Sequence, residues 1–302
     1  MARPPVVLLA ALLASVPFLQ AAAIPTYQPG LPLSTVFKGK EKFDRLVAQA
    51  VRENWRALPI GERTATVGRA LLGTPFVNYT LEIDDHIESP SVNFNGLDCW
   101  TFYEVSLAFA RMLMVKDGDY HPEDLLALIE LERYRDGHCT GNFLSRMHFL
   151  EEVFANNGAR GLSINPTREM GGVPLHRNIT EMTSAWRSYR YLRNNPGLLP
   201  EMARIQERVS ALPVYHIPRS KLAAAEKYIQ TGDIIAITSR DKSGYTSHVG
   251  MAVRTPTGIR FMHATSRRSA GRKVILDGSI ASYLDRTGDH IGIIVYRPLD
   301  IR

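Results

Sequence analysis

The character of the sequence changes at Gly232, and this change limits the folds that the chain can adopt. Before it, segments with apolar residues at helical spacing alternate with breaks at Gly and Pro. After it come four short segments rich in Ile and Val: DIIAITS, SHVGMAV, GIRFMHATS and HIGIIVYRP. Helices followed by antiparallel strands predict an α+β fold.

The expected helices share apolar spacing of three and four residues and end near Gly, Pro or Asn. They cover residues 40–57, 61–76, 97–115, 122–132, 142–156, 179–193, 200–212 and 221–230. An extended segment and the first helix make up residues 24–60, and the main domain is expected over residues 61–302.

The charge balance restricts the partners of the protein. The chain has 302 residues, of which 45% are hydrophobic, and a formal net charge of +6. No run of five or more Lys and Arg residues occurs, and no basic stripe with aromatic residues is visible, so nucleic-acid binding is not supported. The remaining alternatives are an ordinary basic surface and affinity for an acidic polymer such as a cell-wall glycan.

The first 23 residues have the features of a secretory signal peptide. One Arg precedes an apolar stretch that ends in Ala21, Ala22 and Ala23. The apolar run is short for a membrane span and contains Pro17, so stable membrane insertion is not expected. We expect the mature chain to begin near Ile24 and to be exported, as a periplasmic or extracellular protein.

One of only two cysteines lies at the start of the most apolar expected helix, in the stretch NGLDCWTFYEVSLAFARML. Asp98 suits the N-cap of that helix, which places Cys99 in the first turn. Free N–H groups and the helix dipole there favour a thiolate, and a nearby imidazole would lower the thiol pKa further. A packing role for Cys99, or a disulfide with Cys139, is the alternative.

Two of the nine histidines lie in an expected hairpin, HVGMAVRTPTGIRFMH. If Val253 pairs with Gly258, His248 stands opposite His263 on one face of the ribbon. Two such imidazoles can serve one thiol as base and orienting group. A shift of one residue would put them on opposite faces. A zinc site with Cys99 is the other interpretation, but closely spaced ligand pairs are missing, so no metal is expected.

Several stretches carry a resemblance when they are taken in their order along the chain: LLGTPFVNYTLE, LDCWTF, GDIIAITSRDKSGYTSHVGMAV and FMHATS. Together they resemble the NlpC-type, papain-like cysteine peptidases and amidases of bacterial cell walls. The stretches YRDG, SRMHF, TREMGG and IPRSKL are similar to an NlpC-like family of N-acetylmuramoyl-L-alanine amidases. The resemblance runs from about Leu71 to Pro298.

The resemblance implies Cys99 as nucleophile, His248 as general base and His263 as the orienting third residue. It implies a papain-like core, in which the cysteine-bearing helix packs on an antiparallel sheet, with inserted helices over about residues 120–212. The implied substrate is peptidoglycan or a muropeptide, cut between the lactyl group of muramic acid and L-Ala, without a metal or other cofactor. The rival functions are a γ-D-glutamyl-diaminopimelate endopeptidase and a non-catalytic wall-binding protein.

The sequence departs from the family at one position. Enzymes of this type carry a Tyr that helps the oxyanion hole, where this chain has Phe76, and Tyr79 is the nearest replacement. In related endopeptidases the residue before the nucleophile, here Asp98, helps to bind a free amine.

Three further residues are substrate-binding candidates. Arg146 and His148 are expected within one turn of the 142–156 helix, where Arg146 could bind a stem-peptide carboxylate. Glu169, followed by two glycines, could belong to a substrate loop. Packing or solvent exposure is the alternative for all three.

Overall fold

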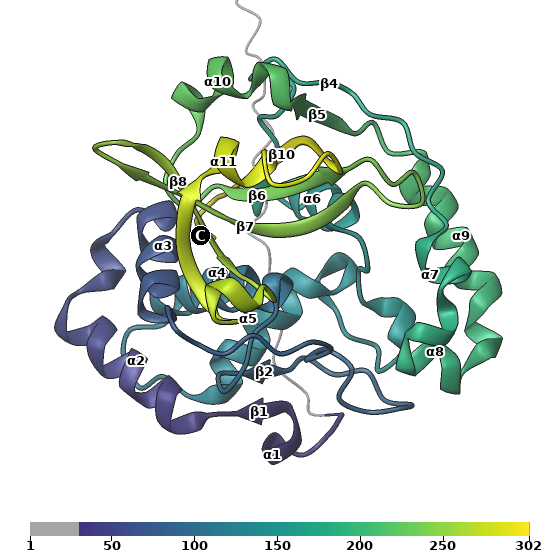
Figure 1. Ribbon diagram of the computed structural model, residues 1–302. Coiled ribbons are helices and arrows are strands. Elements are labelled where there is room, and N and C mark those ends of the chain that lie inside the picture. The colour runs from purple at the N-terminus through teal and green to yellow at the C-terminus, as the bar shows by residue number, and fades with distance from the viewer. Residues whose placement is uncertain (1–29, 302) are drawn as a thin grey trace, which may run out of the picture.

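The computed structural model has the α+β fold with an antiparallel sheet that the sequence predicts (Figure 1). Helices cover both faces of this sheet. The structure describes residues 30–301. The expected signal peptide and the start of the extended segment lie outside these residues. No helix within the described range is long and apolar enough to cross a membrane.

The elements follow in this order along the chain. The helices are α1 (Leu33–Val36), α2 (Lys40–Arg52), α3 (Ile60–Ala70), α4 (Cys99–Val115), α5 (Pro122–Arg133), α6 (Leu150–Ala159), α7 (Glu181–Ser184), α8 (Arg190–Asn194), α9 (Leu199–Ser210), α10 (Leu222–Ala225) and α11 (Ile280–Leu284). The strands are β1 (Phe37–Lys38), β2 (Val92–Asn93), β3 (Ser163–Ile164), β4 (Val173–Pro174), β5 (Tyr215–Pro218), β6 (Ile234–Ser239), β7 (Thr246–Thr255), β8 (Gly258–Ala264), β9 (Val274–Ser279) and β10 (His290–Pro298).

The main sheet has eight strands, seven of them in the order β4-β5-β10-β6-β7-β8-β9, with β3 added to the side of β10. Neighbouring strands in this sheet run antiparallel. The segment after Gly232 supplies its main strands, and β10 returns to pair with both β5 and β6. Strands β1 and β2 form a separate parallel pair.

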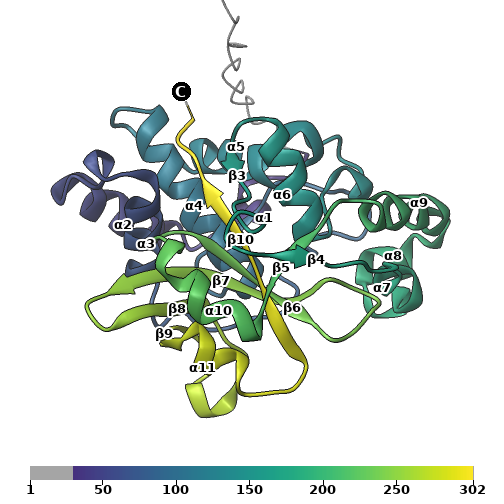
Figure 2. The same cartoon turned by 90° about the horizontal axis from the view of Figure 1, so that it is seen from above.

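Residues of the central strands alternate between two apolar cores. Ile234 and Ala236 of β6 face the larger core, which contains α2 to α6, whereas Ile235 and Ile237 face a smaller core with α10 and α11. Figure 2 shows α4, α5 and α6 on one side of the sheet and α10 and α11 on the other. This period-two alternation is what a sheet buried on both faces requires.

Helix α4 lies in the larger core and is apolar on nearly all sides. Every residue from Thr101 to Leu113 is buried. Asp98 caps the helix as predicted: its Oδ1 accepts from the Thr101 N–H at 2.8 Å, and the Thr101 hydroxyl accepts from the Asp98 N–H at 3.0 Å. This reciprocal capping box fixes the start of α4 at Cys99.

Two expected helices are broken in the structure. The 142–156 range contains a 3₁₀ turn, Phe143–Ser145, and then α6, which begins only at Leu150. Between them the backbone is held by another segment, because the Met147 N–H donates to the Arg133 carbonyl at 3.0 Å. The prediction that Arg146 and His148 share a helical turn is therefore wrong. The 179–193 range is divided into α7, a 3₁₀ turn and α8.

Strands β5 and β9 and helix α11 were not expected from the sequence. Strand β9, VILDGS, loses the alternation of a strand at Asp277 and Gly278. The region over residues 120–212 contains α5 to α9, together with the short strands β3 and β4. In Figure 1, α7, α8 and α9 form one edge of the molecule, away from α2 and α3.

A buried ion pair joins α4 to α5. The Arg133 guanidinium donates to the Glu104 carboxylate from Nη2 at 2.6 Å and from Nε at 3.0 Å. Its second amino group donates to the Ser91 hydroxyl at 3.2 Å. Both charged side chains are almost completely buried. The pair therefore holds α5 and the segment around Ser91, which leads into β2, against the first half of α4.

Replacing Arg133 with Met should destabilise the fold by about 3–5 kcal/mol, because it leaves the Glu104 charge buried without a partner. Denaturant unfolding followed by circular dichroism measures this loss. The double variant Arg133→Met with Glu104→Leu should recover most of it. Arg204→Met, which removes an exposed ion pair with Glu201, serves as the control and should leave the midpoint unchanged. An unchanged midpoint for Arg133→Met alone would contradict the assignment.

Candidate active site

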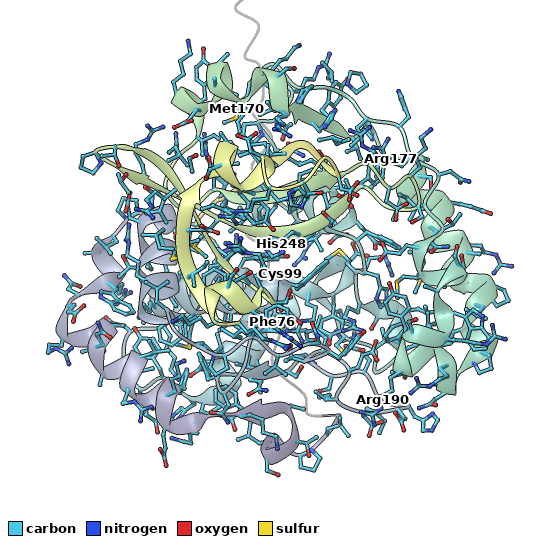
Figure 3. All side chains as sticks on the ribbon, viewed as in Figure 1. Phe76, Cys99, Met170, Arg177, Arg190 and His248 are labelled. Atoms are coloured by element: carbon cyan, nitrogen blue, oxygen red, sulfur yellow. The ribbon has the colours of Figure 1, made fainter. Side chains whose placement is uncertain are left out.

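Cys99 begins α4, and its side chain lies beside the first residues of β7. Cys99, His248 and Val249 line one cavity of about 190 Å³. Figure 3 shows Cys99 and His248 next to each other at the centre of the molecule. Both cysteines are free thiols, so Cys99 and Cys139 form no disulfide.

The β7–β8 hairpin has a different register from the predicted one. Thr255 pairs with Gly258, and Ala252 pairs with Phe261, so the loop shortens from four residues to two and β7 extends two residues further than predicted. The partner position of His248 moves by two residues along β8, and side chains two apart on a strand share a face. His248 and His263 thus remain on one side, as diagonal neighbours instead of a directly opposed pair.

Gly250 lies opposite His263 in the observed register, and the packing here leaves no room for a side chain at position 250. A Cβ atom at this position would lie 2.7 Å from the His263 Cβ and 2.6 Å from the Met262 carbonyl oxygen. The glycine allows the His263 ring to sit across β7 and reach His248.

The two imidazoles and a carboxylate form a hydrogen-bonded chain. His248 Nε2 lies 2.8 Å from His263 Nδ1, and His263 Nε2 lies 3.1 Å from Asp277 Oδ2. Arg286 binds both oxygens of Asp277 at 2.7 Å, and its charge helps to hold the pKa of that carboxyl well below its usual value. Tyr283 stacks on His248 with ring centroids 5.4 Å apart.

The chain of hydrogen bonds determines the tautomer of each histidine. Asp277 is a carboxylate at neutral pH and only accepts, so His263 donates from Nε2. Burial lowers the pKa of His263 to about 4, so the ring is neutral and its Nδ1 accepts from the His248 Nε2–H. Burial also lowers the pKa of His248 well below its usual value, which leaves the lone pair of this neutral ring on Nδ1.

The Cys99 thiol is protonated in this environment, contrary to the expectation of a lowered pKa. Burial, followed by the charge of Asp98, raises its pKa to about 12. The N–H groups of Val249, Trp100 and Cys99 act in the opposite direction but do not outweigh burial. The resting pair is therefore a neutral thiol beside a neutral imidazole, a pair in which the imidazole is a proton acceptor.

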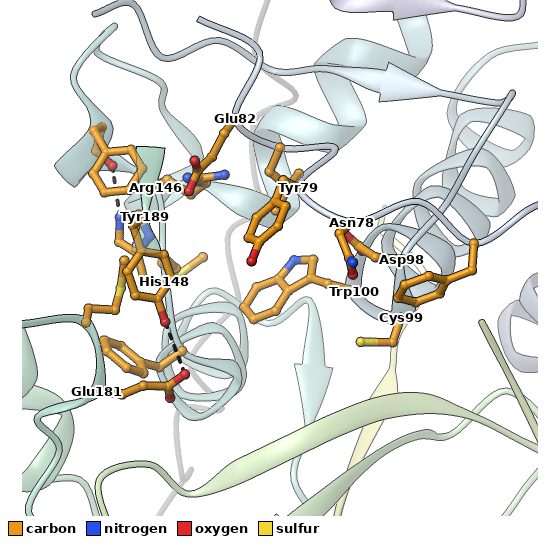
Figure 4. A pocket seen from close by; sticks show the side chains of 16 residues that line it. Asn78, Tyr79, Glu82, Asp98, Cys99, Trp100, Arg146, His148, Glu181 and Tyr189 are labelled. Atoms are coloured by element: carbon orange, nitrogen blue, oxygen red, sulfur yellow. Dashed lines mark hydrogen bonds between the residues drawn. The ribbon is translucent and has the colours of Figure 1, made fainter. Parts of the chain in front are cut away.

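A second, larger cavity of about 350 Å³ opens on the other side of Cys99 and Trp100 (Figure 4). It brings together most of the predicted substrate-binding residues. Its lining includes Phe76, Tyr79, Asp98, Cys99, Arg146 and His148. Tyr79 adopts a left-handed backbone conformation, with φ of 60°, and its side chain is exposed. The phenol is therefore accessible in the cavity, whereas Phe76 offers only an apolar surface.

Arg146 and His148 have partners within the protein. Arg146 is buried, with its Nε 3.7 Å from Glu88 Oε2, and its guanidinium carbon lies 4.8 Å from the centre of the Phe143 ring. His148 Nε2 lies 3.0 Å from the Phe143 carbonyl oxygen, and burial lowers its pKa so that the ring is neutral. Both residues shape the wall of the larger cavity.

Glu169 does not lie at this site. It is exposed and lines a groove with Lys227, Arg254 and Arg297. Its neighbour Met170 lies far from Cys99 in Figure 3. The loop therefore faces another part of the surface from the cavities beside Cys99.

The sequence did not point to Asp277, Trp100 or Glu181 as site residues. Asp277 is brought to His263 by the β8–β9 pairing, and an Asp 14 positions from a chosen histidine has no local signal. Trp100 follows the cysteine directly, and its indole N–H lies 3.4 Å from Glu104 Oε1. Glu181 lines both cavities from α7. Within residues 30–301, no cluster of three or more His, Cys, Asp or Glu side chains could hold a metal ion.

The fold and site define an α+β protein in which a helix-start cysteine shares a cavity with a histidine pair. The sequence profile of the AmiA-like family, described as N-acetylmuramoyl-L-alanine amidase-like, matches residues 66–293. The chain belongs to this family. Among curated proteins, none matches the chain significantly.

Several solved structures share this fold. An N-acetylmuramoyl-L-alanine amidase from Bacteroides uniformis is 27% identical, with a TM-score of 0.72, over 79% of this chain and 98% of its own. A candidate xylanase from Bacteroides fragilis is 27% identical, with a TM-score of 0.69, over 77% and 99% of the two chains. A Legionella pneumophila protein at 17% identity, with a TM-score of 0.62 over 86% and 97%, shares the fold.

The reaction of Cys99 with iodoacetamide should become faster with pH across the range from about pH 5 to 10, without a plateau near neutrality. The raised pKa keeps the thiol protonated throughout, and only the thiolate reacts. Mass spectrometry of a Cys139→Ser variant follows Cys99 alone. The unfolded variant is the control and should titrate near a pKa of about 8.5. A rate plateau below pH 7 would reveal a preformed thiolate and contradict the neutral pair.

Proposed function

We propose that the protein is an exported cysteine amidase that cleaves the amide between the lactyl group of N-acetylmuramic acid and L-Ala in peptidoglycan or muropeptides. The observation that carries the proposal is the hydrogen-bonded chain from Asp277 through His263 to His248, which ends in the cavity of Cys99. Membership of the N-acetylmuramoyl-L-alanine amidase-like family supports the choice of substrate. The signal-like first 23 residues support export.

The first step begins with proton transfer from the thiol to His248. Nδ1 is the ring nitrogen with the free lone pair, so it accepts this proton as Sγ attacks the lactyl carbonyl carbon. The resulting imidazolium is stabilised through His263 by the Asp277 carboxylate, because the other three ring nitrogens in the chain already have hydrogen-bond partners. Proton transfer therefore accompanies attack.

The negative charge on the attacked oxygen needs donors close to the sulfur. The N–H groups of Cys99 and Trp100 lie near enough to affect the thiol pKa, whereas the Thr101 N–H is used by the Asp98 cap. The two free first-turn groups therefore form the proposed oxyanion hole. The Tyr79 hydroxyl, which lies in the same cavity as Cys99, is a further candidate donor.

Collapse of this intermediate breaks the carbon–nitrogen bond. The His248 imidazolium gives its proton to the L-Ala nitrogen, which leaves as a free amine, and the lactyl carbonyl stays on Cys99 as a thioester. Water then attacks the thioester with His248 again as base, and the muramic acid carboxylate is released. The protein groups return to their starting protonation states, and no oxidant or reductant is needed.

The arrangement of α4 on the sheet also supports assignment to the papain-like, NlpC-type superfamily. Val249 and Met251 of β7 lie in the same core as α4, which places the start of the cysteine helix beside the strand that carries His248. Residues of this strand and of α4 thus meet at the mouth of the site, as they do in the fold implied by the sequence resemblance.

Cys99→Ala should abolish cleavage, with a loss of about 10³-fold or more, because no other nucleophile lines the cavities in the same position. Mass spectrometry of defined muropeptides identifies the bond. Free N-acetylmuramic acid and a peptide with an L-Ala amino terminus are the expected products. Cleavage to N-acetylmuramoyl-L-Ala-D-Glu and a peptide that begins with diaminopimelate would instead indicate an endopeptidase. The mechanism would be contradicted if Cys99→Ala kept its turnover. It would also be contradicted if the wild type bound cell walls without any turnover.

Asp277→Asn should lower kcat by roughly 10²-fold and leave KM nearly unchanged. The Asn amide can donate to His263 Nε2, which reverses both tautomers and removes the negative charge behind the imidazolium. Steady-state kinetics on a muropeptide measures the split between kcat and KM. Asp285→Asn removes a more exposed carboxylate paired with Arg219 and serves as the control. Equal losses in kcat and in thermal stability for both variants would assign Asp277 a purely structural role.

A further inference from the structure

The smaller cavity beside Cys99 contains two carboxylates and no basic side chain. Its lining includes the carboxylates of Glu151 and Glu181, the Thr246 hydroxyl, and the histidines His148 and His248. Both histidines in this set are neutral because burial lowers their pKa values. The wall of the cavity therefore provides negative charge without a matching cation, in a chain that carries a net charge of +6.

Glu151 is the more buried of the two acids. Its residue is 5% exposed, and its Oε1 has no hydrogen-bond partner among the residues that the structure describes. The next residue, Glu152, shows the contrast, because its carboxylate accepts from the Arg135 guanidinium at 3.0 Å. Two consecutive acids in the first turn of α6 thus have different environments: one has a basic partner within the protein, and the other faces the cavity.

Burial makes the negative form of Glu151 costly. Burial, with a further contribution from the Glu181 charge, raises the pKa of Glu151 to about 7. The positive N-terminal end of the α6 dipole stabilises a negative charge on Glu151, but it offsets only part of the cost of burial. A buried carboxylate is normally paired with a cation or fully hydrogen-bonded, so an occupant with positive charge would complete this site.

Glu181 is held at the mouth of the same cavity. The Tyr189 hydroxyl donates to its Oε1 at 3.1 Å, as the dashed line in Figure 4 shows. Its Oε2 lies beside Gly244 in the loop before β7. A Cβ atom on Gly244 would lie only 2.9 Å from this oxygen. The Tyr189 hydroxyl thus holds the carboxylate at the cavity, and Gly244 leaves room for it. Oε2 remains able to accept a hydrogen bond.

We propose that Glu151 and Glu181 form a subsite for a primary ammonium group of the substrate. The inference rests on the proposed function, which places a wall fragment at Cys99. A primary ammonium is compact and has three donors, which the two carboxylates and the oxygen of the Thr246 hydroxyl, itself a donor to Glu151, can accept. Two carboxylates fall short of a set that holds a divalent metal ion, and no larger cluster occurs within residues 30–301.

Two parts of a peptidoglycan fragment can supply such an ammonium. One is the side-chain amine of the diamino acid in the stem peptide. The other is the amine of an amino sugar that has lost its N-acetyl group. Both present the same chemical group to the acids, so substrates that differ in one amine at a time distinguish them.

The experiment compares kcat/KM for matched muropeptides. One carries the free diamino-acid amine, a second is N-acetylated at that amine, and a third has a de-N-acetylated glucosamine. The wild type should prefer a free-amine substrate over its acetylated match by roughly ten- to hundredfold, the range of a hydrogen bond between charged groups. Which pair shows the preference identifies the source of the ammonium.

Variants assign the preference to the two acids. Glu151→Gln and Glu181→Gln keep the shape of each side chain and should bring the ratio close to one. Glu152→Gln removes a neighbouring negative charge from the same helical turn and should leave the ratio intact. A wild-type ratio near one for both substrate pairs would overturn the subsite, as would a preference that survives both Glu variants.

Binding measurements separate failure of the subsite from failure of the proposed function. The Cys99→Ala protein should bind the preferred free-amine muropeptide more tightly than its acetylated match in calorimetry, and Glu151→Gln in that background should remove the difference. If the wild type cleaves nothing, the proposed chemistry fails while this difference still supports the subsite. Equal affinities would overturn the subsite even where cleavage continues.

Discussion

The burial of α4 between its neighbouring helices and the sheet determines where the chemistry of this protein can take place. A helix that is apolar on nearly every side has no stable position except inside a core. Its start is fixed by the capping box of Asp98 and Thr101, and the residue after the cap is the cysteine. The position of the thiol is therefore a consequence of packing along a whole helix.

Most buried charges among residues 30–301 are matched by an opposite charge, but Glu151, near the thiol, is not. Arg133 and Glu104 join α5 to α4, and Arg297 binds Asp233 through two hydrogen bonds of 2.7 and 2.8 Å. These pairs offset the cost of burial with good geometry. Glu151 has no such partner, and it lies in the cavity of Cys99. A buried acid without a counter-ion is tolerated where the protein leaves space for one from outside.

Local signals in the sequence predicted the parts of the site that depend on local structure. The Asp-Cys pair at the start of an apolar run indicated the cap and the helix, and both are confirmed. The histidine pair was placed on one face in spite of a wrong register, because an error of two residues conserves the face of a strand. The sheet-forming segments after Gly232 were found from their composition, and all four predicted strands are present.

The remaining errors arise where tertiary contacts override local preference. The backbone of Arg146 and Met147 is held by the end of α5, so no helix forms there in spite of suitable spacing. Asp277 joins the histidines through strand pairing, which leaves no trace at the level of neighbouring residues. Cys99 was expected to be ionised because the helix start is a local feature, whereas the burial that keeps it protonated is a property of the assembled core.

The order of the strands has a consequence for how the protein matures. Strand β10 comes last among the strands along the chain, yet it lies between β5 and β6 in the interior of the sheet. During synthesis the apolar cysteine helix emerges well before this strand, which contributes Ile294 and Tyr296 to the core around the helix. The sheet is therefore completed only when residues 290–298 are available, and the two apolar cores on its faces close only when this last strand is inserted.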